Sequence, residues 1–275
     1  MSSKSIVSRN PVVRWLGWFL LALVFAVACW NLSQWQLARR SAVVEVINRI
    51  DANYAAPASG LEDLMPSKTG FLLSNEYRLV KVSGVYLPEQ ALLVRNRPRS
   101  GQAGFEQLVP LQLVDGSVIF VDRGWLPTGN AQDAPDFNPL PKGDARVTVL
   151  GRLRHSEGTD GRNAPAGQIA HAHIAEAASR SNLSNSQTYL GAYLALESEN
   201  PAYRAPRALG RPNITEGNHL SYAFQWLLFA VMAFGALIWA IRQERLQLRA
   251  SRDPGFIVKK RRKLGQDDQD YEDAS

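Results

Sequence analysis

Two uncharged stretches constrain the fold of this chain more than any other feature of its sequence. Residues 15–32 form a run of 18 residues without a charged side chain, and residues 220–241 form a run of 22. At about 1.5 Å per helical residue these runs reach about 27 Å and about 33 Å, which suits a hydrocarbon core of about 30 Å. Because no comparable run lies between them, the sequence predicts two transmembrane helices that flank a folded domain.

The first stretch resembles a signal peptide only in its position. Its apolar run is longer than the core of about 7–15 residues in a signal peptide, and Cys29-Trp30-Asn31 lacks the small residues of a cleavage site. Residues 1–14 are also too short for the Arg-rich amphipathic helix of a mitochondrial presequence. We therefore expect a retained membrane anchor.

The net charge of +6 belongs mostly to the flanks of the two stretches. Residues 1–14 carry three basic side chains, and residues 242–275 carry nine basic and seven acidic ones. The region 33–218 is nearly neutral, with 19 basic and 18 acidic side chains, so it lacks the basic face that nucleic-acid binding requires. Basic residues gather on the cytoplasmic side of membrane helices, and although Arg39 and Arg40 argue weakly against it, both termini are predicted to be cytoplasmic.

The predicted layout follows from this topology, with two spans in a bacterial-type plasma membrane. It comprises a cytoplasmic N-terminus (1–14), transmembrane helix 1 (15–32), an extracytoplasmic β-rich domain (33–218), transmembrane helix 2 (219–241) and a cytoplasmic tail that is first basic and then acidic (242–275). Cys29 is the only cysteine, so no intramolecular disulfide is possible.

The region between the spans has the texture of a mainly antiparallel β domain, either a sheet or a partial barrel, with minor helices. Asp115-Gly116 favours a tight hairpin turn between residues 108–114 and 118–121. Other strands are predicted at residues 79–87, 91–95, 146–153 and 189–196, and helices at residues 41–65 and 168–180, the latter in a mobile Ser/Asn/Gly-rich insertion.

His219 is the candidate for metal or haem binding, because it stands at the predicted entry to the second span. Helical spacing places Tyr222, Ala223 and Trp226 on its face, where the aromatic side chains would form a flat apolar slot beside one imidazole ligand. Interfacial histidines also bind headgroups or loops through simple hydrogen bonds, and aromatic residues are common at membrane surfaces. The residues alone leave both interpretations open.

Other polar groups carry weaker signals. His171 and His173 are spaced for a metal on a strand but not on a helix, which their alanine-rich surroundings predict. Arg95, Arg97 and Arg99 alternate, which favours a solvated strand face over a clamp for carboxylates. The Asp122-Arg123 pair is interpreted as structural rather than catalytic. The sequence has no G-x-S-x-G elbow, P-loop or C-x-x-C pair, so no catalytic residues are predicted.

Several segments, in order along the chain, resemble those of the surfeit-locus (Shy-type) family of cytochrome c oxidase assembly factors. They are Trp35-Gln36-Leu37-Ala38-Arg39-Arg40, Val82-Ser83-Gly84-Val85-Tyr86 with Arg95-Asn96-Arg97, Val121-Asp122-Arg123-Gly124-Trp125-Leu126-Pro127, Asn200-Pro201, and Asn218-His219-Leu220-Ser221-Tyr222-Ala223-Phe224-Gln225-Trp226. They match, for example, the family's R-G-W-[IV]-P and N-H-L-x-Y-A-x-[QT]-W patterns. The insertion around residues 155–188 and Asp122, where asparagine is common, depart from the family.

The resemblance implies a non-enzymatic role in the assembly of haem–copper oxidases. By residue-to-residue transfer, His219 would be an axial ligand of haem a, with Trp226 and Tyr222 packing against the ring. The expected partners are cytochrome c oxidase subunit I, other oxidase assembly factors and the lipid bilayer, with no nucleic acid. The alternative function is a cofactor-free membrane scaffold that holds oxidase subunits or other assembly factors during biogenesis.

Overall fold

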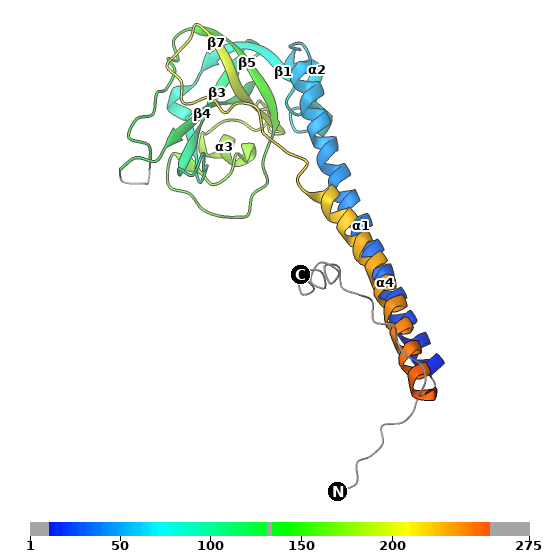
Figure 1. Cartoon of the computed structure of the whole chain (residues 1–275). Coiled ribbons are helices and arrows are strands. Elements are labelled where there is room, and N and C mark those ends of the chain that lie inside the picture. Colours follow the sequence, from blue (N-terminus) through cyan, green and yellow to red (C-terminus); the bar gives the residue numbers. More distant parts are fainter. Residues whose placement is uncertain (1–10, 131–133, 254–275) are drawn as a thin grey trace, which may run out of the picture. The chain divides into compact units, whose positions relative to one another are not determined.

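The protein contains two long helices. The computed structural model describes residues 11–130 and 134–253, and its longest elements are α1 (Pro11–Ala55) and α4 (His219–Arg252) (Figure 1). Both are long and apolar enough to cross a membrane, which confirms two membrane helices around a β-rich domain. Each helix extends past its predicted span. In α1 no proline follows Pro11 until Pro57, two residues beyond the helix end. The first span therefore continues without a break into the helix predicted from residue 41.

The described residues divide into two compact units, residues 11–43 with 216–253 and residues 44–215. The first unit holds the antiparallel pair of α1 and α4, in which Phe19 and Phe234 approach to 6.2 Å between ring centroids. The predicted boundaries at residues 32/33 and 218/219 describe where a bilayer would end, and they remain predictions.

Small side chains line the contact between these two helices, which we call the helix seam: Ala22, Cys29, Ser33 and Ala223. All four are buried, whereas most large apolar side chains of the pair are exposed. Small residues let two backbones approach closely, which supports helix association where hydrophobic burial offers no advantage. The exposed apolar faces are those expected to contact lipid.

The second unit contains a closed five-stranded barrel. Its strands are β1 (Leu79–Tyr86), β3 (Gly104–Leu113), β4 (Val118–Pro127), β5 (Arg146–His155) and β7 (Ala192–Asn200), in the order β1-β5-β7-β4-β3, with β3 pairing back to β1. All of these pairings are antiparallel except β4 with β7. The predicted hairpin is confirmed, with Leu113 donating to Ser117 across the Asp115-Gly116 turn at 2.7 Å.

Short elements complete the unit. They are α2 (Leu61–Leu64), two 3-10 turns (Leu73–Asn75 and Pro88–Gln90), β2 (Leu92–Val94), β6 (Gln168–Ile169) and α3 (Ile174–Arg180). The main core fills the barrel with aliphatic side chains of β1, β3, β4, β5 and β7.

The insertion differs from its prediction. Residues 168–180 were expected to form one helix in a mobile segment, but β6 pairs in parallel with β2 and only residues 174–180 are helical. Ile169, Ile174 and Ala177 are fully buried in a second core cluster with Phe120 of the barrel. A second core formed on the outer face of the barrel thus anchors this part of the insertion.

Candidate functional site

His219 is the first residue of α4 and lies against α1. Its Nδ1 is 2.9 Å from Oε1 of Gln36, which follows Trp35 in the first of the family-like segments. An amide oxygen can only accept, so Nδ1 carries the proton in this hydrogen bond. The neutral imidazole then presents the lone pair of Nε2, which is the form in which histidine binds metals.

The approach to Nε2 is kept open by the residue two positions earlier. Gly217 has φ of +66°, and a Cβ atom there would lie 3.7 Å from Nε2, so a side chain would cover this edge of the ring. Arg40 fixes the adjoining loop through an ion pair with Glu216 at 2.7 Å. Arg40 therefore has a carboxylate partner within the chain, in a pair that is partly exposed.

The predicted aromatic partners of His219 occupy different positions around α4. Ala223 is buried in the helix seam, Trp226 is partly buried and packs edge-on against Phe229 at 5.7 Å, and Tyr222 is 49% exposed. Within the described residues neither Tyr222 nor Trp226 makes a ring contact with His219. His219 therefore contacts Gln36, and the two aromatic side chains lie on the same helix without contacting the imidazole ring.

Gln36 is the functional candidate that the sequence interpretation missed. It lies 183 positions from His219, and helical periodicity relates only residues of one helix. One signal was present, because Gln36 is a polar residue between the first span and the Arg39-Arg40 pair, in a segment that resembles the family.

The helix pair offers one imidazole nitrogen, oriented by Gln36, of the kind that would bind a haem iron. The aromatic side chains around it face outward, with Trp35 and Tyr222 both about half exposed. His219 therefore lies at an open surface, where a haem would be held by one ligand and not by an enclosing pocket. The groove of about 530 Å³ between the helices lies at their other end, between Trp15 and Glu244, away from His219.

The other histidines do not form a metal centre. His171 Nε2 lies 2.9 Å from Asp160 Oδ1, and His173 precedes the first turn of α3. Across residues 11–130 and 134–253 no group of three His, Cys, Asp or Glu side chains could hold a metal ion.

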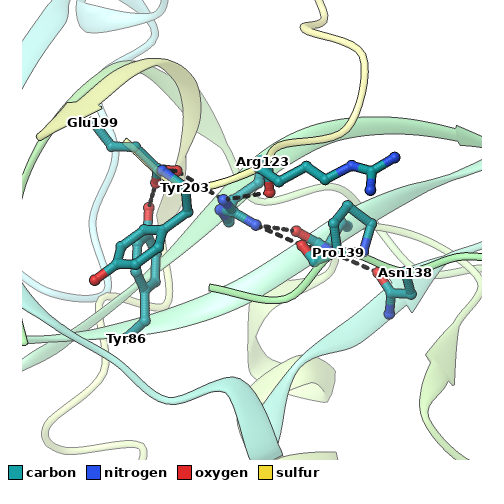
Figure 2. Close-up of polar contacts among 8 residues, drawn as sticks. Tyr86, Arg123, Asn138, Pro139, Glu199 and Tyr203 are labelled. Carbon is teal, nitrogen blue, oxygen red and sulfur yellow. Dashed lines mark hydrogen bonds and ion pairs between the residues drawn. The ribbon is translucent and has the colours of Figure 1, made fainter. Parts of the chain in front are cut away.

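Arg123 organises a buried polar network in the barrel unit. Its Nη2 donates to Glu199 at 2.7 Å, and its Nη1 donates to Gln107 at 2.8 Å and to the Pro139 carbonyl at 2.9 Å. Glu199 also accepts from Tyr86 at 2.7 Å. Figure 2 shows Glu199 and Pro139 on opposite sides of the Arg123 guanidinium. A buried charge is costly unless it is paired. The network therefore holds the segments that contain Glu199 and Pro139 against Arg123 of β4.

Asp122 and Arg123 have separate structural contacts, because consecutive strand residues point to opposite faces. Asp122 is buried on the other face of β4, where it accepts from the Gly124 N–H at 3.0 Å. Burial raises the pKa of Asp122 well above its usual value, and the nearby Glu106 carboxyl raises it further. Arg97 contacts Glu106 at 2.9 Å on the same face.

The predicted solvated strand face of Arg95, Arg97 and Arg99 is wrong. Residues 95–98 are not part of a strand, and Arg97 joins Glu106 to Glu157, the latter at 2.6 Å. Arg99 donates to the carbonyl oxygens of residues 207 and 208 at 3.3 Å and 2.7 Å. Both side chains tie segments of the barrel unit together.

The R-G-W signature of β4 holds the segment 204–207. Arg123 Nη2 donates to the Arg204 carbonyl at 3.3 Å, and the Trp125 and Arg207 backbones exchange hydrogen bonds of 2.8 Å and 2.9 Å. Between them, Gly124 has φ of +130°, and a Cβ atom there would lie 2.6 Å from the Arg207 carbonyl oxygen. Only glycine permits this approach of the two backbones.

Comparisons with known proteins agree with these motifs. Residues 23–231 match the model of the SURF1 family, a range that includes Gln36, the R-G-W signature and His219. An uncharacterized SURF1-like protein of Mycobacterium tuberculosis (strain ATCC 25618 / H37Rv) is 29% identical over 226 residues, covering 79% of this chain and 80% of the relative.

Eukaryotic relatives are similar over shorter stretches. A SURF1-like protein of Monosiga brevicollis is 28% identical over 167 residues, covering 57% of this chain and 61% of the relative. Surfeit locus protein 1 of Xenopus tropicalis is 27% identical over 167 residues, covering 54% and 50%.

Proposed function

The chain belongs to the SURF1 family, whose members are known in general as oxidase assembly factors, and we propose that it binds haem a through His219. In this proposal it assists the insertion of haem a into subunit I of a haem–copper cytochrome c oxidase. The observation that carries the proposal is the hydrogen bond of 2.9 Å between His219 Nδ1 and Gln36 Oε1. With Nδ1 bonded to Gln36, Nε2 is the ring nitrogen left for a ligand.

Each residue has a separate task in this proposal. His219 supplies the axial nitrogen, Gln36 holds the imidazole in the tautomer with a free Nε2, and Gly217 leaves that nitrogen accessible. Trp226 and Tyr222 provide apolar surface beside the ring. The bound haem would supply the redox and oxygen chemistry of the oxidase only after transfer, so the chain itself needs no catalytic residue.

An open surface suits transfer better than storage. A haem enclosed by protein must wait for the pocket to open, whereas one held by a single ligand at a lipid-facing surface can leave when another protein offers stronger ligation. The proposed location is the outer leaflet of a bacterial plasma membrane, where the predicted topology places His219.

The test is the haem content of the full chain purified from cells that make haem a. We expect the wild type to show the absorption bands of a ligated haem, and His219→Ala to lose them. Gln36→Leu should weaken haem retention by about tenfold or more, the usual effect of losing an orienting partner. His171→Ala, which removes an imidazole elsewhere, is the matched control. Equal haem content in wild type and His219→Ala would refute the proposed ligand.

The second candidate is a cofactor-free scaffold, and a specific groove favours it. Trp15, Trp18, Phe25, Ala233 and Ala236 line part of the cavity of about 530 Å³ between α1 and α4. Large aromatic side chains beside small residues suit the side of a partner's transmembrane helix. Haem-free protein that purifies with unfinished oxidase, equally well as wild type and as His219→Ala, would support the scaffold over the haem chaperone.

A further inference from the structure

Three arginines project from the segment held by the R-G-W signature, and we call them the arginine strip: Arg204, Arg207 and Arg211. Residues 201–215 contain these three basic side chains and no acidic one. The surrounding region 33–218 is nearly neutral. Positive charge is therefore concentrated locally on a domain whose net charge is close to zero.

Each guanidinium of the strip lies over an aromatic ring. Arg204 stands 4.3 Å from the centre of the Phe137 ring, and Arg207 stands 5.2 Å from that of Trp125. Stacking fixes the plane of a guanidinium while leaving its N–H edges free to donate. In the part of the chain that the structure describes, neither arginine has an ion-pair partner. Both are exposed cations held ready for an external acceptor.

Arg211 completes the strip in a similar way. It lies 5.2 Å from the centre of the Tyr54 ring and forms an ion pair with Asp51. Both members of this pair are about half exposed, so solvent weakens their attraction and a competing carboxylate can replace Asp51.

The backbone beneath the strip is fixed by several independent contacts. Arg207 pairs with Trp125 in both directions, Arg204 accepts from the buried Arg123, and Arg99 donates to residues 207 and 208. A fixed backbone holds the arginines at constant spacing, which lowers the ordering cost of binding. The R-G-W signature thus positions the exposed arginine strip in addition to its part in the buried network.

A neighbouring arginine, Arg154, has only one distant carboxylate partner in the described residues. Arg154 lies 4.7 Å from the centre of the Tyr77 ring and 3.6 Å from Glu76, yet it makes no hydrogen bond within the described ranges. Its side chain is only 27% exposed, and it lines a cleft of about 360 Å³ with Arg99 and Arg211. The pair with Glu76 is long, and the Arg154 Nε is buried without a hydrogen-bond partner in the described residues, so this guanidinium can bind a further carboxylate.

We propose that the arginine strip, with Arg154 in the adjoining cleft, binds an acidic segment of a partner protein. Carboxylates match the planar guanidinium fork, and an extended peptide can reach cations spread over eight residues. Apolar surfaces alternate with the cations, because Phe137, Pro139 and Pro206 line a shallow cavity of about 230 Å³ beside Arg204 and Arg207. An acidic segment with apolar residues between its carboxylates fits this surface, whereas inorganic phosphate would use only the charges.

The test uses the full chain in nanodiscs of neutral phosphatidylcholine. The probe is a fluorescent peptide that repeats aspartate, leucine and glutamate, and its counterpart repeats asparagine, leucine and glutamine. We expect only the acidic peptide to bind, with affinity falling as salt rises. Arg204→Gln with Arg207→Gln should weaken binding by about tenfold or more, and Arg204→Lys with Arg207→Lys by a smaller factor, because lysine keeps the charge but loses the fork.

A control variant removes the same charge elsewhere in the domain. Arg146→Gln with Arg162→Gln changes two exposed arginines outside the strip and should bind the peptide like the wild type. Equal losses in the control and strip variants would overturn the proposal, because they would show a general charge effect. Wild-type affinity in the strip variant would overturn it too, as would tighter binding of a soluble short-chain phosphatidylglycerol than of the peptide.

Discussion

Asp122 shows how burial alters the chemistry of a single carboxyl group. It accepts one hydrogen bond, from the Gly124 N–H, and its other oxygen has no hydrogen-bond partner within the described residues. Burial and the adjacent Glu106 raise its pKa, so the folded state holds a proton that the unfolded chain releases. The family that this sequence resembles commonly has asparagine at this position. An asparagine side chain accepts the same hydrogen bond and cannot ionise.

This difference predicts a pH-dependent stability. Between the ordinary pKa of 3.8 and the raised value, the folded protein binds more protons than the unfolded chain, so stability falls as pH rises. We expect Asp122→Asn to remove this loss of stability. The free energy of unfolding of the variant should therefore increase relative to that of the wild type as pH rises from about 4. Urea unfolding of the full chain in detergent, followed by tryptophan fluorescence across that pH range, measures it.

Asp115→Asn is a control of opposite sign. Hydrogen bonds from Ser117 lower the pKa of Asp115, so this carboxylate stabilises the fold above its ordinary pKa and loses that effect as pH falls. Below about pH 4 the asparagine variant should therefore lose stability relative to the wild type as pH rises, and at higher pH the difference should stay constant. Parallel pH profiles for wild type and Asp122→Asn would contradict the buried, protonated state of Asp122.

At individual residues the sequence identified His219 but neither its partner nor its surroundings. His219 was recognisable as a candidate because an imidazole at a helix entry can bind a metal, and the family-like segment added to this. Gln36 and Gly217 acquire their roles only when α1 and α4 meet, and no one-dimensional pattern encodes that contact. The site itself, with Tyr222 and Trp226 as haem contacts, remains a prediction.

The helix seam is the element-scale feature that depends most on small side chains. Cys29 is 1% exposed and Ala223 is 2% exposed, so nothing larger fits between the helices without separating them. Both spans are apolar all round, and hydropathy alone therefore cannot show which face is buried. The most deeply buried residue of α4 is Ala223, near the start of the helix.

The only cysteine of the chain reports on this seam. We expect Ala223→Leu to force α1 and α4 apart and expose Cys29, which would then react with N-ethylmaleimide in detergent at least about tenfold faster than in the wild type. Mass spectrometry of the intact chain measures the modification. Phe224→Leu, on the exposed neighbouring position, should leave Cys29 protected. Rapid reaction of wild-type Cys29 would contradict a tightly packed seam.

The strands were predicted more completely than their arrangement. Alternating side chains and the Asp115-Gly116 turn located β1, β3, β4 and β5 to within a few residues. The pairing of β3 with β1 that closes the barrel, and the parallel pairing of β4 with β7, join segments far apart in the sequence. Such contacts depend on the shared core, so the sequence allowed either an open sheet or a partial barrel.

At the scale of the whole molecule, charge is distributed in two ways. The flanks of the membrane spans carry the net excess, which sets the predicted orientation. The barrel unit is nearly neutral, yet it concentrates cations on the arginine strip. The basic flanks act during membrane insertion, and the arginine strip is proposed to bind a partner. Both uses of positive charge are therefore possible without a generally basic surface on the barrel unit.

The orientation gives a prediction for the intact cell. Nine basic residues follow the second span and three precede the first, so both termini should lie in the cytoplasm and the barrel outside the plasma membrane. In a Cys29→Ser background, Ser100→Cys places an exposed thiol on the barrel unit and Ser251→Cys places one near the end of α4. A membrane-impermeant maleimide should label only Ser100→Cys in spheroplasts and should label both variants after permeabilisation. Labelling of Ser251→Cys in sealed spheroplasts would reverse the orientation, and would then move His219 to the cytoplasmic leaflet.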